Sequence, residues 1–432
     1  MGCHRESRDH YIGVLEVLRV LDVLKVRKVQ NPENLYPVYV SFSSRLQSDL
    51  EPNRLTLAVE RARTGGRSLI DLTESNPTRA GFDYPSNLLQ PLGDPKGLCY
   101  GPDPSGLLEA RVAVAGDYQR RGLRVNPERI VLTASTSEAY SLLFKVLCDP
   151  GDEVLVPRPS YPLFEHLSTL DAVVARRYSL EYHGRWTVDV DHVQRAWSPR
   201  TRAVLVVSPN NPTGSRVRSS ELVELAAICV KNDAALIIDE VFADYMWSSR
   251  SAGERGHVLF EPDVLSFSLG GLSKTVGLPQ VKLGWMAIGG PQDMVRDAQA
   301  RLELAADTYL SVSTPVQLSA ATLLADGAAV RTQIQARLAK NLAVLGERAS
   351  RTSSCQVLTA DGGWSAVIQV PSYQSEEDLV LACIEEDGVL VHPGYFFDFP
   401  RESFVVVSLL VRPDQFAEGV DRIFARFDRR SA

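Results

Sequence analysis

Three short apolar runs most constrain how this chain can fold. They are Glu153–Val156, Ala203–Val207 and Ala234–Ile238, and helical segments separate them along the sequence. Strands that are buried on both faces have this continuous apolar composition, whereas strands with one face in water alternate between apolar and polar residues. The pattern therefore predicts an α/β fold built on a mostly parallel sheet that helices cover on both sides.

Further elements are predicted upstream of these runs and just after them. Arg129–Thr133 and Val264–Leu269 have the composition of strands, and a helix at Ser137–Leu147 follows the first of them. Near the N-terminus, Asp49–Arg63 reads as a capped amphipathic helix and Ser68–Thr73 as a short strand. The strands at 129–133 and 264–269 enlarge the predicted sheet, and the N-terminal helix and strand precede it.

The C-terminal third has a different pattern. Pro315–Arg348 predicts a long helical stretch that links two domains. Trp364–Val370 and Phe404–Leu410 are strand-like, and a helix at Ser375–Asp387 lies between them. Strands and a helix in this order indicate a smaller α+β domain.

The length of 432 residues is too great for one ordinary core, so we expect two domains. The expected large domain covers residues 96–325, the small domain covers 326–432, and residues 46–95 form a segment that packs with the small domain. Residues 1–45 are expected to be a poorly specified extension. Val14–Lys28 repeats a Val-Leu-charged triplet, which gives a helix no steady apolar face and differs from the uninterrupted apolar centre of a signal peptide.

Composition excludes several function classes. The formal net charge is -7 with no basic stripe, so we expect no nucleic acid partner. No run reaches the roughly 18 apolar residues that a membrane helix needs, so we expect no membrane partner. The six cysteines include no CxxC pair and no zinc-like spacing with histidine, so we expect no metal site and a reducing, cytoplasmic setting.

Polar residues gather where the predicted strands end. In parallel sheets ligands bind at the carboxyl ends of the strands. The residues at these ends are Ser135–Ser137, Ser160–Tyr161, Asn210–Asn211, Asp239–Glu240 and Lys274. We therefore expect them to meet at one binding site.

Lys274 is the residue in this set with the most distinctive chemistry. It stands in a Gly/Ser-rich turn after a strand, where a lysine amine can form a Schiff base with a carbonyl cofactor. Ser273 and Lys282 would suit the phosphate of such a cofactor. The alternative is a surface loop with two solvated lysines. Asp239, likewise, either caps a helix or pairs with a buried cation such as a pyridinium nitrogen.

The remaining strand ends add an anion site, a ring and an amide. Thr133–Ala139 places three hydroxyl residues at a helix N-terminus, which either binds an anion or simply caps the helix. Tyr161 could stack on a flat cofactor or lie in the core. Asn211 lies in the turn Ser208–Gly214 and can donate a hydrogen bond from its amide.

Together these segments resemble the class I/II aminotransferases, fold-type I enzymes that use pyridoxal 5′-phosphate (PLP). The resemblance runs from about Arg45 to the C-terminus and rests on five segments in matching order and spacing. These are Tyr100–Gly106, the Pro-Ser-Tyr-Pro segment around Tyr161, the Asn-Asn-Pro-Thr-Gly turn, Asp239–Glu240, and the Ser273–Lys274 pair followed by Lys282. The resemblance implies a large domain with a mostly parallel seven-stranded sheet and a smaller α+β domain.

The resemblance also implies a role for each matching residue. Lys274 would hold PLP as an internal aldimine and then shuttle a proton. Asp239 would pair with the pyridine nitrogen, Asn211 would bond the phenolic oxygen, and Tyr161 would stack on the ring. Tyr100 would reach the phosphate of a neighbouring subunit, which implies a homodimer with shared active sites. The residues expected around the phosphate within one subunit are Ser135, Thr136, Ser137, Ser273 and Lys282.

The chain also departs from the family pattern. Lys282 stands where an arginine is usual, Gly271 where serine is common, and Phe242 where a tyrosine often bonds the ring oxygen; Tyr245 is a possible substitute. The largest departure is Val406, at the position of the arginine that usually clamps the substrate's α-carboxylate.

Three residues are candidates for the missing carboxylate contact. Arg79 and Asn76 lie in the polar loop after the first predicted strand, and Arg412 lies downstream of Val406. For both arginines the alternative is a solvated surface charge. The identity of the substrate is therefore left open by the sequence.

Three functions follow from this pattern. The first is an aminotransferase that moves an amino group from an amino acid to a 2-oxo acid by a ping-pong mechanism. The second is another PLP reaction on the same fold, such as β/γ-elimination, γ-replacement or an oxidative or cyclising step. The third is a non-catalytic regulator, but residues 1–45 are too short for the DNA-binding domain that it would need.

Overall fold

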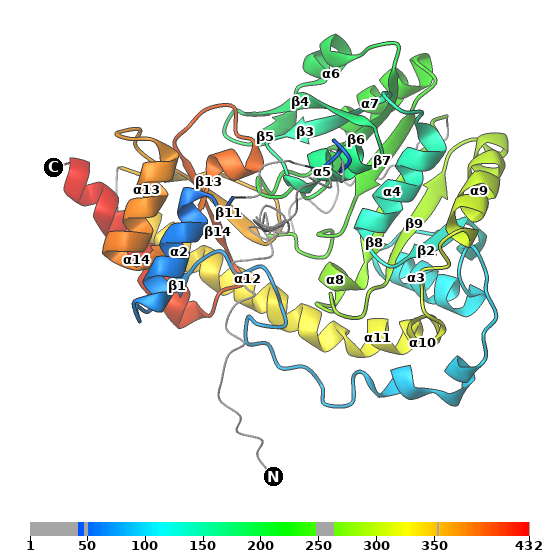
Figure 1. Ribbon diagram of the computed structural model, residues 1–432, viewed down its shortest axis with the longest axis horizontal. Helices are drawn as coiled ribbons and strands as arrows, with labels where there is room; N and C mark the ends of the chain where they lie inside the picture. Colours follow the sequence, from blue (N-terminus) through cyan, green and yellow to red (C-terminus); the bar gives the residue numbers. More distant parts are fainter. Residues whose placement is uncertain (1–41, 47–50, 248–262, 352–353, 432) are drawn as a thin grey trace, which may run out of the picture.

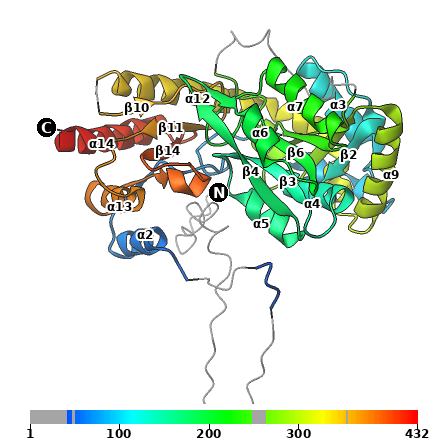
Figure 2. The same ribbon diagram turned by 90° about the horizontal axis from the view of Figure 1, so that it is seen from above.

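The computed structural model describes residues 42–46, 51–247, 263–351 and 354–431. Of the predicted extension at residues 1–45, all but residues 42–45 lie outside these ranges. The described chain forms two lobes. The larger lobe is built on an eight-stranded sheet, and the smaller lobe on a four-stranded sheet with α2, α13 and α14 (Figure 1). Figure 2 shows that α13 and α14 lie at the opposite end of the molecule from α9.

The large sheet has the strand order β2-β9-β8-β7-β6-β3-β4-β5. Strand β9 pairs antiparallel with both of its neighbours and β5 pairs antiparallel with β4, so the other six strands all run in one direction. The strands are β2 (Ile130–Thr133), β3 (Glu153–Arg158), β4 (Val174–Tyr182), β5 (Trp186–Val188), β6 (Thr201–Val207), β7 (Ala235–Asp239), β8 (Ser266–Gly271) and β9 (Gly284–Gly289).

The mostly parallel sheet is confirmed, but it has eight strands where seven were expected. The additional strand is β5, which turns back onto the end of β4 and extends the sheet at its edge. Only Tyr178 and Leu180 of β4 are buried, whereas β7 is buried throughout and β6 is buried except at Arg202. The central strands were predicted from continuous apolar runs, and the edge hairpin of β4 and β5 has no such run. The eighth strand therefore had no signal in the sequence.

Helices cover both faces of the large sheet, as the apolar runs predicted. In β6, Ala203, Leu205 and Val207 pack with α4, α5 and α9, whereas Val204 and Val206 pack with α6 and α7. Every residue of β6 except Arg202 is therefore buried, by one layer or the other. The helices of the larger lobe are α3 (Leu108–Arg120), α4 (Thr136–Leu147), α5 (Leu163–Leu170), α6 (Val190–Ala196), α7 (Ser219–Lys231), α8 (Leu272–Thr275) and α9 (Gln292–Asp307).

The smaller lobe contains the sheet β10-β11-β14-β13 and a two-stranded pair of β1 (Ile70–Asp71) with β12 (Val389–Leu390). The strands at 364–370 and 404–410 are confirmed, and the helix at 375–387 is confirmed with a π-helical last turn, Cys383–Asp387. The elements are α2 (Arg54–Thr64), β10 (Gln356–Val357), β11 (Ser365–Gln369), α13 (Glu376–Ala382), β13 (His392–Pro393), β14 (Phe404–Ser408) and α14 (Pro413–Ser431).

A chain of three helices joins the two lobes where one long helical stretch was predicted. They are α10 (Thr314–Leu318), α11 (Ala320–Asp326) and α12 (Ala328–Ala349). The side-chain amide of Asn341 in α12 donates to the carbonyls of Leu409 and Val411. These bonds fix the end of β14 against the connecting helix and so position the small sheet relative to the large one.

Candidate active site

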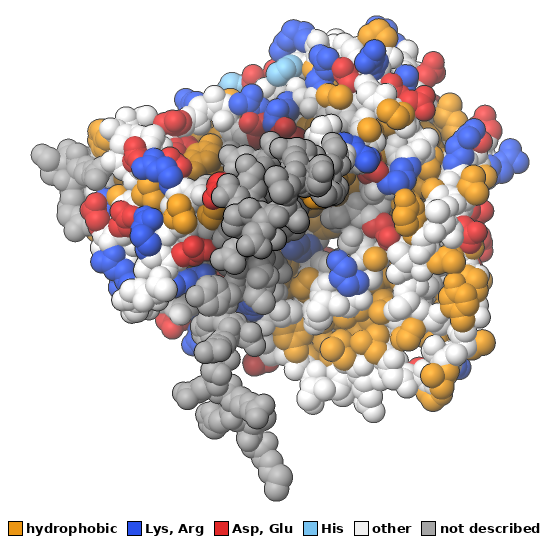
Figure 3. Space-filling view, in the orientation of Figure 1, with side chains coloured by type: hydrophobic (Ala, Val, Ile, Leu, Met, Phe, Trp, Pro, Cys, Tyr) orange, Lys and Arg blue, Asp and Glu red, His pale blue; other side chains and the backbone are white. Residues whose placement is uncertain are grey.

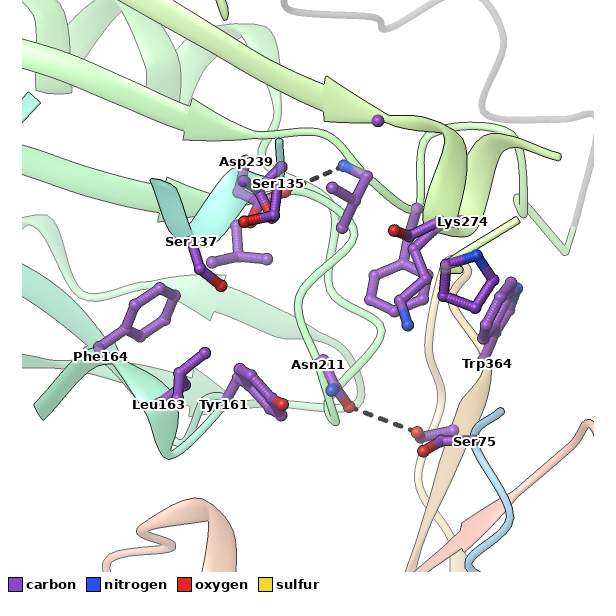
Figure 4. Close-up of a pocket in the computed structure, with 18 of the residues that line it drawn as sticks. Ser75, Ser135, Ser137, Tyr161, Leu163, Phe164, Asn211, Asp239, Lys274 and Trp364 are labelled. Atoms are coloured by element: carbon purple, nitrogen blue, oxygen red, sulfur yellow. Dashed lines mark hydrogen bonds between the residues drawn. The ribbon is translucent and has the colours of Figure 1, made fainter. Parts of the chain in front are cut away.

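A cavity of about 380 Å³ lies at the carboxyl ends of the large sheet's strands, and both lobes line it. This volume falls within the range of small-molecule sites, roughly 300–1,000 Å³. From the larger lobe it receives most of the strand-end residues that the sequence singled out, but not Ser160, Asn210 or Glu240. From the smaller lobe it receives residues of β11, β13 and β14. Figure 4 shows part of this lining: Ser135 and Asp239 lie close together in this view, and Asn211 and Trp364 lie apart from them.

Lys274 occupies the centre of the lining. It belongs to the short helix α8 directly after β8, and its side chain extends between Trp364 and Asn211 (Figure 4). Its Nζ lies 5.0 Å from the ring centre of Trp364 and 5.9 Å from that of Phe242. The Tyr245 hydroxyl donates to the Lys274 carbonyl at 2.5 Å, so it fixes the lysine's backbone and not its amine.

Asp239 is the last residue of β7 and is only 7% exposed. Its Oδ2 accepts a hydrogen bond from the Tyr140 hydroxyl at 2.7 Å, and its Oδ1 accepts one from the Val241 amide at 3.0 Å. Burial nevertheless raises the pKa of the Asp239 carboxyl. A ligand with a positively charged N–H group would stabilise the ionised form of this buried carboxylate. Asp239 therefore suits a cationic group bound in the cavity.

The N-terminus of α4 opens onto the cavity and has the physical properties of an anion site. Ser135 is the N-cap, and its Oγ accepts a hydrogen bond from the Glu138 amide at 3.1 Å. Ser135 is therefore a helix cap that also lines the cavity, together with Thr136 and Ser137. The twelve-residue helix points its partially positive end at this space.

Glycines allow the strand β9 to pass directly beside this helix end. A Cβ on Gly284 would lie 2.8 Å from the carbonyl carbon of Ser135, so no larger residue fits there. A Cβ on Gly271 would lie 3.1 Å from the Leu283 carbonyl oxygen. The glycine found where a serine was expected thus accompanies a tight approach of β8 and β9.

Ser273 and Lys282 line the same cavity and come from the segment after β8. Lys282 is exposed to solvent and adopts a left-handed backbone with φ of 62°. Among the described residues that line the cavity there is no arginine. Lysine and the helix N-terminus are therefore the positive groups available to an anion at this end.

Tyr161 and Asn211 face the cavity from two neighbouring turns. Asn211 Oδ1 lies 3.3 Å from the Ser365 hydroxyl of the smaller lobe (Figure 4). The preceding residue, Asn210, joins the two turns because it bonds Ser160 Oγ at 2.7 Å and the Pro159 carbonyl at 3.0 Å. Sequence reasoning missed this buried bridging role of Asn210.

The smaller lobe supplies residues that the sequence analysis did not find. Trp364, Ser365, His392 and Ser408 all line the cavity, together with Val406. Val406 and Ser408 are two residues apart in β14 and therefore face the same side of the small sheet. Because side chains alternate between the two faces of a strand, the sequence could have placed Val406 and Ser408 on one face of β14. It does not show, however, which face meets the other lobe.

Four further predicted residues lie outside the cavity lining. Arg79 is exposed, and Arg412 lies at the surface with its Nε 3.6 Å from Asp414. Asn76 Oδ1 accepts hydrogen bonds from the amide and hydroxyl of Thr78, within its own turn. Tyr100 is 71% exposed. The structure therefore brings neither of the two arginines to the position where Val406 replaces the expected cation.

Two further properties concern only the part of the chain that the structure describes. It contains no cluster of three or more side chains with the arrangement of a metal site. None of its helices combines the length and the apolarity that crossing a lipid bilayer requires. On the face drawn in Figure 3, basic and acidic side chains are interspersed and form no stripe of one sign.

The lining fits PLP as a ligand. The α4 N-terminus with its hydroxyls and Lys282 suits a phosphate, the Lys274 amine suits an aldehyde, and the buried Asp239 carboxylate suits a protonated ring nitrogen. These three features lie on one cavity wall formed by the strand ends of the larger lobe. The donor set therefore matches all three reactive parts of this cofactor.

Comparison with known proteins agrees with this assignment. The model of the family described as aminotransferase class I and II matches residues 70–423. The glutamate-pyruvate aminotransferase AlaA of Escherichia coli K12 is 31% identical over 270 residues, which are 61% of this chain and 65% of that protein. The corresponding protein of Haemophilus influenzae is 26% identical over 84% of this chain and 91% of its own.

A solved aminotransferase structure from Escherichia coli superposes with a TM-score of 0.78 at 25% identity. It covers 90% of this chain and 98% of that chain. The alignment with the curated Escherichia coli relative spans 65% of that relative's length, slightly under two thirds. The fold is thus shared over nearly the whole described chain, although the sequence likeness is modest.

Proposed function

The chain belongs to the class I and II aminotransferase family, and from that premise we propose that it is a PLP-dependent aminotransferase. It would carry an amino group from an amino donor to an oxo acceptor in two half-reactions at one site. The observation that carries this proposal is the meeting of Lys274, Asp239 and the α4 N-terminus around one cavity. Two of the relatives are glutamate-pyruvate aminotransferases, which favours a 2-oxo acid such as pyruvate as the acceptor.

When bound, PLP supplies an electron sink that acidifies the C–H bond next to the substrate nitrogen. In this chain Lys274 would hold the cofactor through its ε-amine and, once displaced, carry a proton at the substrate carbon. Asp239 would keep the ring nitrogen protonated, and Asn211 would donate to the ring oxygen. Tyr161 would contact the ring face, while Trp364 and Phe242 shield the Lys274 amine from water.

The phosphate would be held by Ser135, Thr136, Ser137, Ser273 and Lys282. Amide and hydroxyl donors at the end of a helix bind a dianion in fixed positions, and Lys282 adds a point charge without the bidentate geometry of arginine. We therefore propose weaker phosphate anchoring at this position than an arginine would give. Gly284 supports the arrangement, because it lets β9 pass against the Ser135 turn.

We also propose that the protein acts as a homodimer. Supporting this, large apolar side chains are exposed on the segments at residues 98–100 and 304–310: Leu98 is 91% exposed, Tyr100 71% and Leu304 74%. Tyr100 and Leu310 border one small depression, so the two segments are neighbours. A second copy that covers this surface would place Tyr100 at the partner's phosphate site. Sedimentation of the wild type and of Tyr100→Ala, with PLP affinity as the second readout, tests this.

No disulfide joins the five cysteines of the described ranges, which supports the proposal of a reducing, cytoplasmic setting. The test of the function itself begins with reconstitution. Purified protein should become yellow when PLP is added. Borohydride should then attach the cofactor permanently, and peptide mapping should find it on Lys274. Addition of an amine should bleach the visible band, and a 2-oxo acid should restore it. Release of ammonia without this cycle would instead show an elimination reaction and overturn the proposal.

A further inference from the structure

One face of the small sheet forms the second wall of the cavity. Ser365 pairs with Ser408 and His392 pairs with Val406 across antiparallel strands, so these four side chains share a face. We call them the β13–β14 wall, and all four line the cavity. Whatever group the substrate carries beside its reacting carbon must be accommodated here or against the apolar side chains of α5.

His392 is the polar member of this wall whose hydrogen-bonding groups are available. It is only 8% exposed, and no hydrogen bond joins its imidazole to another residue within the described chain; its recorded contacts are with the rings of Phe396 and Phe397. Ser408, in contrast, donates to the Glu74 carbonyl at 2.5 Å, and Ser365 lies 3.3 Å from Asn211 Oδ1. A buried polar group without a partner in a cavity points to a ligand that supplies one.

The charge of the wall limits what that ligand group can be. Among the described lining residues the lysines are Lys274 and Lys282, and the proposed cofactor engages both. Burial lowers the pKa of His392 to about 4, so its imidazole is neutral at pH 7. A substrate carboxylate at this wall would lose its hydration and gain no opposing charge, next to the apolar Val406.

A hydroxyl group matches the wall better than a carboxylate does. Neutral imidazole offers one donor and one acceptor, and a hydroxyl is both donor and acceptor on a single atom. Its methylene carbon would contact Val406, which is 1% exposed. Leu163, Phe164 and Leu167 of α5 add an apolar surface for the rest of the substrate.

We propose that in one half-reaction the enzyme takes a 2-amino alcohol, a primary amine whose reacting carbon bears a hydroxymethyl group that His392 hydrogen-bonds. This proposal rests on the aminotransferase function above. The C–NH₂ carbon is oxidised to a ketone, water supplies the carbonyl oxygen, and the cofactor receives the nitrogen and two electrons. A 2-oxo acid takes both back in the other half-reaction and becomes an amino acid. Because its carboxylate meets no cation on this wall, its KM is the higher of the two.

A series of amines with one side chain tests the proposal on the PLP-loaded enzyme. The probes are L-leucinol, L-leucine, L-leucinamide and 3-methylbutylamine, which differ only in the group on the reacting carbon. Loss of the visible band at increasing amine concentration gives the rate and the half-saturation concentration. We expect half-saturation for L-leucinol to be at least about tenfold lower than for each of the other three.

Two variants locate the effect. His392→Phe keeps a ring of similar size but removes both hydrogen-bonding nitrogens, so it should raise half-saturation for L-leucinol about tenfold and leave 3-methylbutylamine unchanged. His183→Phe, at an exposed histidine paired with Glu181, is the matched control and should change neither. Val406→Arg should reverse the preference toward L-leucine. Calorimetric binding of the four amines to the Lys274→Ala protein gives the same ranking without turnover.

The outcomes separate this proposal from the function on which it rests. If L-leucine bleaches the band at a lower concentration than L-leucinol, the enzyme is an aminotransferase but the wall assignment is wrong. If L-leucinamide equals L-leucinol, or if His392→Phe changes all four amines alike, the hydroxyl contact to His392 is wrong. If no amine bleaches the band and no 2-oxo acid restores it, the aminotransferase function itself is overturned.

Discussion

The cavity has two unlike walls, and each comes from a different lobe. The wall from the larger lobe consists of strand ends and a helix N-terminus, and it concentrates charge: the Lys274 amine, the Asp239 carboxylate and the Lys282 amine. The β13–β14 wall from the smaller lobe has one neutral imidazole beside valine and partnered serines. The difference indicates a division of labour in which the first wall holds the reactive group and the second selects the substrate.

The sharpest test of the first wall is Lys274→Ala. Loss of this amine removes the attachment of the cofactor and the proton carrier together, so the rate of amine exchange should fall by about 10⁴-fold or more. Stopped-flow measurement of the visible band gives the rate, and borohydride followed by peptide mapping should find no label. Lys231→Ala, at an exposed lysine that ends α7, serves as control and should keep full activity. If borohydride still attached the cofactor to the Lys274→Ala protein, Lys274 would not be the residue of the first wall that holds PLP.

Asp239→Asn should give the second largest effect. The substitution keeps the shape and lets the Tyr140 hydroxyl still donate, but it removes the charge that stabilises a protonated ring nitrogen. The rate constant of the amine half-reaction should fall by about 10²–10³-fold, as when one preorganised electrostatic contact is removed. Asp233→Asn, an exposed aspartate in a left-handed turn where asparagine is well tolerated, should leave the rate unchanged. An unchanged rate in Asp239→Asn would make this carboxylate a structural cap.

The same division explains how much of the site the sequence could predict. Ser135, Asp239 and Lys274 follow recognisable strand-turn patterns, and parallel strands bring their carboxyl ends to one edge, so their meeting could be expected from local order alone. His392 stands in a two-residue strand, and its place opposite Val406 depends on the register of an antiparallel pair. That register, and the way the small sheet meets the large one through α12, involve residues far apart in the chain.

The fold shows the same limit. The central strands were predicted from apolar runs, whereas β5 was not, because its three residues add an edge hairpin with no run of its own. The connecting helices were predicted as one stretch and form three, with a break at Gly327. A Cβ at this residue would lie 2.5 Å from the Leu323 carbonyl oxygen and 2.6 Å from Val276 Cβ. Contacts of this kind arise only in the packed structure.

Lys282 provides a smaller effect at the edge of the first wall. Lys282→Ala should weaken PLP binding about 10–100-fold, because a hydrogen bond to a charged group is worth about 1.5–3 kcal/mol. Lys282→Arg should bind PLP at least as tightly as the wild type, since a guanidinium can contact two phosphate oxygens. Equilibrium dialysis of PLP measures both. Equal affinity in all three proteins would show that the α4 N-terminus holds the phosphate without this cation.

The smallest expected effect tests whether His392 is neutral, on which the contrast between the walls depends. Burial lowers its pKa to about 4 in the folded protein, from an ordinary value of 6.5. The unfolded chain therefore binds a proton that the folded chain does not, and His392 contributes stability above pH 6.5 that is lost as the pH falls toward 4. Between pH 7 and pH 5.5 this loss is about 1 kcal/mol.

His392→Phe lacks this titration, so its free energy of unfolding should fall by about 1 kcal/mol less than that of the wild type over the same interval. Urea unfolding at the two pH values measures both proteins, and the difference of differences removes the contribution of every other titrating group. If His392→Phe follows the wild type, the imidazole accepts a proton in the folded protein as easily as in water. The second wall would then carry a positive charge below about pH 6.5 and could bind a carboxylate there, so the two walls would no longer differ in kind.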